Sequence, residues 1–392
     1  MIRSVAVAAV ASLFVTLAAG CSSAESTADD ETSAAAVDIS ALTVQPYAKV
    51  GTGVAGAGES DINTPDGVIF NAKGNLLLTD AMNHRVQVWD VRTSETPRRL
   101  GQFGTPDIFH GEVVDLAELP NGQVIVTDET AHVAYMFDPP TGKEKGDLAS
   151  TDYKFTGTDM FTKEMIGKVG GVTTDSKGRI YTVDARKSLV KRYLGDGTPD
   201  PTFAFEKNGG GQYLHGCEGV AVDEKRGNLY VASEQDSIVQ VFNLEDGTYK
   251  NQMIGGHPDA AHPGTQAGTR LFPAAVEGLW ILDDYLLASD EADGGVGHVK
   301  IFDLREETTF DHGADDYAAL KKSKAKSGYV GSFGTFCSPD SVTAFTETDG
   351  ESYVAVADQC HYQVVIYKWS DIVKAAKLTR RAPSGDAGPD AP

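Results

Sequence analysis

The stretch Leu76-Leu77-Leu78-Thr79-Asp80, an apolar run that ends in a carboxylate, recurs along the chain and decides the fold. Five further apolar runs end in an acid, at intervals of 48 to 68 residues. The repeated acids are Asp80, Asp128, Asp184, Glu234, Asp290 and Asp358. An internal repeat of about this period, built from short strands and polar turns, is typical of a β-propeller. The sequence therefore predicts an all-β protein with six blades.

Each repeat contains a hairpin, a loop and a further strand. In the first copy, residues 65–70 and 76–79 flank a polar turn, and residues 85–90 alternate apolar and polar side chains as a third strand. A glycine-containing outer strand follows at residues 99–104 and recurs at 330–334. A similar stretch at residues 48–53 precedes the first repeat, whereas the last repeat ends after its third strand. We therefore expect this N-terminal stretch to be the outer strand of blade six and to close the ring.

The two ends of the chain differ in composition from the repeats. Residues 1–20 resemble an export signal and end at Leu17-Ala18-Ala19-Gly20-Cys21, which resembles the bacterial lipobox. In such signals the cysteine is lipidated, so we expect Cys21 to anchor the protein to a membrane outside the cytoplasm. The alternative is ordinary secretion with a chance cysteine. Composition predicts a disordered tether at 21–40, the propeller at 41–370, and a short helix with a disordered tail at 371–392.

Three cysteines remain in what we expect to be an exported chain, where disulfides persist. Cys337 comes just before the first strand of the last repeat, and Cys360 comes just after its second strand. Because antiparallel neighbours bring those two ends together, we expect a Cys337–Cys360 disulfide and an unpaired Cys217. None of the three has the close spacing typical of a zinc site.

The chain of 392 residues has a formal net charge of −22. This charge argues against nucleic-acid binding, which depends on basic patches. An acidic surface can simply aid solubility, or it can collect cations. We expect the protein to be monomeric.

The first strand of each repeat, which lines the central channel of a propeller, carries acids at or next to one position. These acids are Asp66, Asp115, Glu218, Glu277 and Asp340, with Gly171 at the corresponding place in the third repeat. Carboxylates that converge on one channel mouth repel one another unless a cation neutralises them. A cluster of oxygen ligands without His or Cys favours Ca²⁺. The alternative is that acid–Gly pairs begin strands for backbone reasons and that water solvates the acids.

The second half of the chain resembles a known family. The stretches Cys217-Glu218-Gly219-Val220 and Val276-Glu277-Gly278-Leu279, with residues 329–333 and 340–342, are similar to blades four to six of the β-propeller phytases. Members of that family remove phosphates from inositol phosphates with several calcium ions at the channel mouth. The resemblance covers about residues 160–370 and implies several bound Ca²⁺ ions. The resemblance implies that Glu218, Glu234, Glu277 and Asp340 bind the metal and that the three glutamates act in catalysis. The alignment of strand starts adds Asp66 to the expected metal ligands.

The first half of the chain resembles NHL-type repeats instead, as in Thr64-Pro65-Asp66-Gly67. The basic residues with which phytases hold phosphate are largely replaced here. A cation stands at the third-blade position, Arg186, beside Lys187, and Arg85 is a further candidate. We therefore expect Arg186, Lys187 and Arg85 to bind the substrate.

Two functions are consistent with these patterns. The first is a calcium-dependent phosphomonoesterase of phytase-like type that acts on phytate or another small phosphorylated substrate. The second is a non-catalytic NHL-like propeller that binds a protein or glycan partner. A calcium-dependent lactonase of the gluconolactonase kind fits less well, because Pro120-Asn121-Gly122 lies in a predicted turn and not at a strand start.

Overall fold

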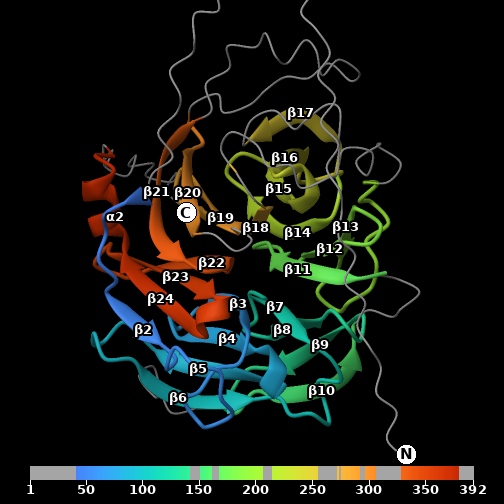
Figure 1. Ribbon diagram of the computed structural model, residues 1–392. Helices are drawn as coiled ribbons and strands as arrows, with labels where there is room; N and C mark the ends of the chain where they lie inside the picture. Colours follow the sequence, from blue (N-terminus) through green and yellow to red (C-terminus); the bar gives the residue numbers. More distant parts are fainter. Residues whose placement is uncertain are drawn as a thin grey trace, which may run out of the picture. The chain divides into compact units, whose positions relative to one another are not determined.

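The computed structural model describes residues 41–141, 151–160, 167–205, 214–254, 272, 275–291, 296–305 and 328–378. In these residues six small sheets stand side by side in a ring, which confirms the all-β, six-bladed propeller (Figure 1). The signal and tether predicted for residues 1–40, with Cys21, lie outside the described residues, as does the tail from residue 379.

Within each blade the strands follow one another from the channel outward. Blade one contains β3 (Pro65–Phe70), β4 (Leu76–Asp80), β5 (Arg85–Asp90) and β6 (Arg98–Phe103). Blade two contains β7 (Val113–Glu118), β8 (Val124–Asp128), β9 (Val133–Asp138) and β10 (Lys154–Asp159). Blade three contains β11 (Val169–Thr174), β12 (Ile180–Asp184) and β13 (Leu189–Tyr193) in the described part of the chain.

The last three blades are built on the same plan. Blade four contains β14 (Cys217–Asp223), β15 (Asn228–Ser233), β16 (Ile238–Asn243) and β17 (Tyr249–Ile254). Blade five contains β18 (Ala275–Leu282), β19 (Tyr285–Glu291), β20 (Gly297–Asp303) and β21 (Tyr329–Phe336). Blade six contains β22 (Pro339–Thr346), β23 (Ser352–Asp358) and β24 (Gln363–Lys368).

The N-terminal strand closes the ring as the sequence predicts. Strand β2 (Ala48–Val50) pairs antiparallel with β24 and places Lys49 opposite Val365, so β2, in blue, lies against β24, in red (Figure 1). A shorter strand, β1 (Ala41–Leu42), pairs parallel with β21 and adds a fifth strand to blade five. The sequence patterns did not predict β1, because a pair of residues is too short to show a period.

The repeated acids hold the inner strands in place. In four blades the acid at the end of the second strand is fully buried and accepts the backbone N–H of the residue two before the inner strand. The pairs are Asp80–Asn63, Asp128–Gly111, Asp184–Gly167 and Asp358–Cys337, at 2.7 to 2.8 Å. In blade four the Ser233 hydroxyl accepts the corresponding N–H, from His215, at 2.9 Å. The acid recurs because the half-buried loop before each of these inner strands needs an acceptor for this N–H group.

The hydrophobic core lies between adjacent blades. One cluster joins Leu78 and Trp89 of blade one to Val364 and Ile366 of blade six across the closure. Corresponding clusters lie at the boundaries between blades one and two, two and three, three and four, and five and six. Since burial of apolar area is the main driving force of folding, the ring is stabilised chiefly where blades meet.

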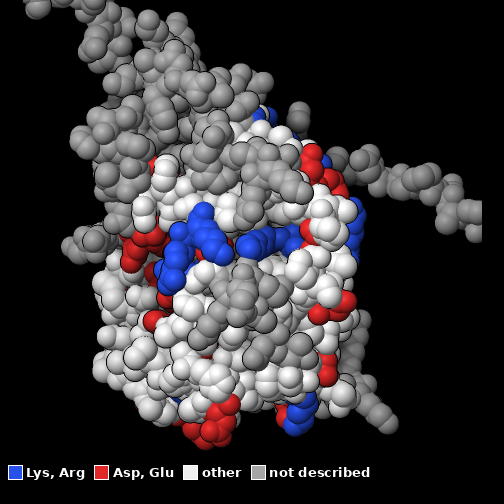
Figure 2. Space-filling view, turned by 90° about the vertical axis from the view of Figure 1, so that its right-hand side faces the viewer, with Lys and Arg blue, Asp and Glu red and all other residues white. Residues whose placement is uncertain are grey.

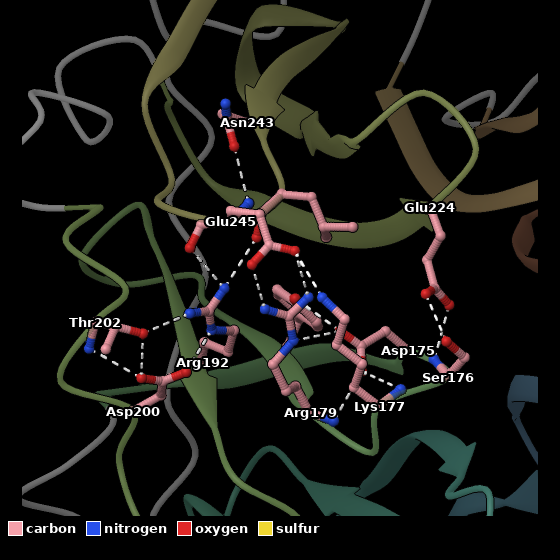
Figure 3. A network of polar contacts seen from close by, with 12 residues as sticks. Asp175, Ser176, Lys177, Arg179, Arg192, Asp200, Thr202, Glu224, Asn243 and Glu245 are labelled. Atoms are coloured by element: carbon pink, nitrogen blue, oxygen red, sulfur yellow. Dashed lines mark hydrogen bonds and ion pairs between the residues drawn. The ribbon is translucent and has the colours of Figure 1, made fainter.

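Polar side chains reinforce the boundary between blades three and four (Figure 3). The guanidinium of Arg179 donates to Asp175 on its own blade and to Glu245 on the next, at 2.5 and 2.8 Å. The Glu224 carboxylate accepts both the N–H and the hydroxyl of Ser176, at 2.7 and 2.6 Å. Hydrogen bonds from Arg179 and Lys177 lower the pKa of Glu245 to about 2. These contacts connect the turn after β11 in blade three to the turns after β14 and β16 in blade four.

The structure contains the disulfide between Cys337 and Cys360, whose Cα atoms are 5.7 Å apart, whereas Cys217 is a buried free thiol. The predicted helix after the last strand is α2 (Trp369–Ala375), which packs Trp369 and Ile372 against blades five and six. In the described residues, no helix combines the length and the apolar composition that crossing a membrane requires.

Candidate functional site: the acidic mouth of the channel

All six inner strands carry a β-bulge at the same place. In blade one the register shifts between Pro65 and Val68, and it shifts at the corresponding residues of the other five blades. The residues at the first bulge position are Asp66, Val114, Gly170, Glu218, Glu277 and Asp340. A bulge breaks the alternation of the strand and re-aims a side chain, so four of these positions can present a carboxylate to the channel.

The glycine after the acid has a separate reason. A Cβ atom on Gly219 would lie 2.0 Å from the carbonyl oxygen of Glu277, and one on Gly278 would lie 2.5 Å from that of Asp340. Each of these glycines therefore lets the backbone of the next blade approach closely around the ring. Packing explains the glycine of each acid–Gly pair but does not explain the acid. The alternative that both residues serve the backbone thus accounts for only half of the motif.

The bulged ends of the inner strands surround a cavity of about 260 Å³ at one mouth of the channel. Eight carboxylates line this cavity, which we call the acidic mouth: Asp66, Asp115, Glu129, Glu218, Glu234, Glu277, Glu291 and Asp340. All five residues predicted to bind metal are among them. Among the described lining residues, Lys168 is the one cation.

Glu129 and Glu291 were missed in the sequence, although a signal for them existed. Each follows directly after the repeated acid that ends the second strand, as Glu234 follows Ser233 in blade four. In blade six the same position is Gln359, which also lines the mouth. The acidic mouth therefore has two tiers, one from the bulges of the inner strands and one from the residues that follow the second strands.

Burial and mutual repulsion act together on the deepest carboxylates. Burial, followed by repulsion from Asp340 and Asp115, raises the pKa of Asp66 well above its usual value. Burial, followed by repulsion from Glu218 and other lining acids, raises the pKa of Glu277 in the same way. Removal of these charges from water is costly unless a cation or a proton compensates them.

Two other lining acids have partial compensation. Burial raises the pKa of Asp115 to about 7, although its carboxylate accepts N–H groups from Val172 and Leu116 at 2.8 Å. Burial also raises the pKa of Glu218 to about 7, and the ammonium of Lys168, 3.4 Å away, opposes this rise. Lys168 also pairs with Glu129 and so bridges the two tiers on one side of the mouth.

The opposite side of the mouth has no such cation among the described lining residues. There the hydroxyl of Ser338 donates to Glu291 and lies 3.3 Å from one oxygen of Asp340. The other Asp340 oxygen is buried and has no hydrogen-bond partner in the described structure. Burial, followed by repulsion from Glu291, raises the pKa of Asp340 well above its usual value.

The donor set fits a hard cation such as Ca²⁺, since it consists of carboxylates and one orphaned oxygen of Asp340. No three His, Cys, Asp or Glu side chains of the described segments are grouped tightly enough to hold an ion as they stand. Occupation by calcium would therefore require the carboxylates to draw together, with water completing the ligand shell.

The three cations predicted to bind substrate lie elsewhere. Arg85 is buried in blade one, where it pairs with Asp80 at 2.6 Å and donates to the carbonyl oxygens of Gly58 and Asp61 at 2.7 and 2.9 Å. This role is structural, and it leaves Arg85 no surface on which to receive a phosphate.

Arg186 and Lys187 are exposed on the loop after β12, and neither lines the acidic mouth. The Lys187 ammonium lies 3.7 Å from the carboxylate of Asp184.

Figure 2 shows one face of the molecule on which Lys and Arg side chains gather in a band, in contrast to the net negative charge of the chain.

Comparisons with known proteins give limited likenesses. No family model matches the chain. It is 34% identical over 127 residues to the β′ subunit of the DNA-directed RNA polymerase of Methylibium petroleiphilum, and 25% identical over 166 residues to the protein brain tumor of Drosophila melanogaster. These stretches are 32% and 41% of this chain, but only 8% and 13% of those proteins.

Two solved structures match most of the chain at low identity. The aldose sugar dehydrogenase of Streptomyces coelicolor, solved with bound PQQ, has a TM-score of 0.48 and 15% identity over 83% of this chain and 98% of that one. A gluconolactonase of Xanthomonas campestris has a TM-score of 0.47 and 13% identity over 85% of this chain and 98% of that one. Neither likeness assigns an activity to this chain, so the argument for function rests on the acidic mouth.

Proposed function

We propose that the chain is a calcium-dependent phosphomonoesterase of phytase-like type, with the acidic mouth as its active site. The observation that carries this proposal is the convergence of eight carboxylates on one cavity, several of them with a raised pKa. Such a cluster favours a bound cation. The Glu–Gly motifs of blades four and five, which carry the resemblance to β-propeller phytases, supply Glu218 and Glu277 to this cluster.

The ligands would come from neighbouring blades. Glu218, Glu234 and Glu277 would hold calcium at the boundary of blades four and five, and Asp66 and Asp340 would extend the ligand set toward blades one and six. When bound, calcium would neutralise the substrate phosphate and lower the pKa of the attacking water.

The residues around these ligands would position the substrate. Lys168 is fixed between Glu129 and Glu218, so its ammonium could receive a phosphate oxygen without leaving the mouth. Ser338 would keep Asp340 and Glu291 in place through its hydroxyl group. Lys168 therefore replaces Arg85 in our proposal, while Arg186 and Lys187 would act only as exposed charges outside the mouth.

A second candidate function is a non-catalytic NHL-like propeller that binds a protein or glycan. The observation in its favour is that Lys168 is the one cation among the described lining residues, which is little positive charge with which to hold a phosphorylated substrate. In both cases we propose a lipid anchor at Cys21 outside the cytoplasm, and the Cys337–Cys360 disulfide supports an oxidising compartment.

Phosphate release separates the two candidates. The purified protein is incubated with phytate and with p-nitrophenyl phosphate, each with 2 mM calcium chloride or with excess EDTA. Release that depends on calcium and is lost in Glu277→Gln would support the phosphatase. Calcium binding without release from either compound would favour the binding propeller instead.

A further inference from the structure

The channel has a second cavity, of about 530 Å³, at the end opposite the acidic mouth. Its walls are the later residues of the six inner strands, whereas the acidic mouth is built from the first residues of the same strands. Because all six inner strands run in the same direction along the channel, the two cavities open at opposite ends. The volume of the second cavity is in the range of small-molecule sites.

The chemistry of this cavity differs from that of the acidic mouth. Apolar side chains form most of the wall, and two aromatic rings, Phe70 and Phe345, lie together with their centroids 6.0 Å apart. Trp280 adds a third aromatic ring from blade five. Three aromatic rings around one space provide apolar area for a ligand, and the guanidinium of Arg92, 5.0 Å from the centroid of the Phe345 ring, already lies over one of them.

Two carboxylates of blade two line this cavity: that of Asp115, which also lines the acidic mouth, and that of Glu118, which lies at the end of the strand. One oxygen of Glu118 accepts the backbone N–H of Ala72, and Glu118 forms no ion pair within the described residues. Burial raises the pKa of Glu118, which the Ala72 N–H and the charge of Lys73 oppose. The carboxylate is thus held in place by one bond and keeps an oxygen free for a ligand.

The positions of Glu118 and Trp280 define the ends of the cavity. They stand on blades two and five, which lie opposite each other in a ring of six. Trp280 is half-buried and lines the cavity, so its indole ring can contact a ligand. Phe70, on blade one, packs against Phe345 of blade six, so these two rings lie together on one part of the wall.

From this arrangement we infer that the second cavity is a binding site for a small organic cation with a flat apolar body. The ammonium group pairs with Glu118, and the apolar body lies along the wall toward Trp280. This site does not depend on the proposed function, because Glu118 lies at the end of the channel opposite the acidic mouth, although Asp115 lines both cavities.

The test uses two probes of equal length, 4-phenylbutylamine and its neutral counterpart 4-phenylbutanol, titrated by calorimetry against the full protein saturated with calcium. Calcium occupies the acidic mouth and so suppresses attraction of the amine to it. We expect saturable binding of the amine at one site, at least about tenfold tighter than the alcohol, since a charge-assisted contact is worth about that factor.

Matched variants locate the bound amine. Glu118→Gln is expected to weaken the amine about tenfold and to leave the alcohol unchanged, whereas Trp280→Phe weakens both probes. Glu224→Gln removes an exposed carboxylate that belongs to neither cavity and is expected to leave both affinities unchanged. Equal affinities of amine and alcohol for the unmodified protein would overturn the inference, and so would amine binding that Glu277→Gln weakens as much as Glu118→Gln does.

Discussion

The disulfide between Cys337 and Cys360 connects the two loops of blade six that meet at the acidic mouth. Cys337 precedes Ser338, whose hydroxyl contacts Asp340, and Cys360 follows Gln359, which lines the mouth. The two cysteines are 23 residues apart in the sequence. Closing a loop of this length reduces the entropy of the unfolded chain and so raises its free energy by about 3.4 kcal/mol at 25 °C. In a propeller of this size, removal of the disulfide is therefore expected to lower Tm by roughly 5 °C.

The double variant Cys337→Ser/Cys360→Ser measures this contribution directly. Urea unfolding without calcium is expected to show a free energy of unfolding lower by about 3 kcal/mol. The native protein with and without a reducing agent is the control and should reproduce the same difference. The calcium affinity of the variant is also expected to fall, because the loops that carry Ser338 and Gln359 are no longer tied together. A loss below about 1 kcal/mol would refute the assignment of the disulfide as a main constraint on the unfolded chain.

Three further predictions concern the acidic mouth. Glu277→Gln is expected to weaken calcium binding at least about tenfold in a calorimetric titration, whereas Glu224→Gln leaves the calcium affinity unchanged. Equal calcium affinities of the two variants would contradict the assignment of Glu277 as a ligand. Burial raises the pKa of Asp115 to about 7, whereas its pKa in the unfolded chain is near the usual 3.8. Between these values the folded state binds a proton that the unfolded state has lost. The free energy of unfolding of the calcium-free protein is therefore expected to fall as pH rises from about 4 to about 7. Urea unfolding at several pH values checks this fall, and a profile that Asp115→Asn does not flatten would count against it. Gly219→Ala places a Cβ atom 2.0 Å from the carbonyl oxygen of Glu277. This clash is expected to lower the free energy of unfolding by about 1–3 kcal/mol. A variant as stable as the native protein would show that the blades can separate at little cost.

The repeat pattern was sufficient to predict the blades, since each hairpin is a local structure with its own period and turn. Closure by residues 48–50 could also be predicted, because the last repeat lacked a fourth strand and a matching strand stood before the first repeat. The pairing of β1 with β21 could not, since a strand of two residues is stabilised by its neighbour and not by its own pattern.

At the mouth, the sequence identified the acids of the inner strands but not the second tier. Asp66, Glu218 and Glu277 could be found by aligning the strand starts, whereas the signal for Glu129 and Glu291 was only their shared position one residue past the repeated acid. The bulges themselves could not be predicted, because the change of register that turns these inner-strand acids into the channel does not show in the period of the sequence.

The cations show where sequence reasoning about charge fails. Arg85 has a side chain suited to phosphate, but its neighbour Asp80 and two carbonyl oxygens hold it inside blade one. Lys168 was not selected because it stands alone before an inner strand, yet the ring places it between Glu129 and Glu218. Which charges meet depends on contacts between blades, and these are set by the closed ring.

A calorimetric calcium titration of the unmodified protein at pH 7.5 tests the central claim, that the acidic mouth is a cation site, most directly. We expect a saturable heat of calcium binding, of either sign. We also expect calcium to raise the Tm of the protein, since a ligand that binds only the folded state stabilises it. The binding should weaken strongly in Glu277→Gln. Absence of any calcium-dependent heat and an unchanged Tm at 10 mM calcium would contradict the claim and leave the eight carboxylates without a bound cation.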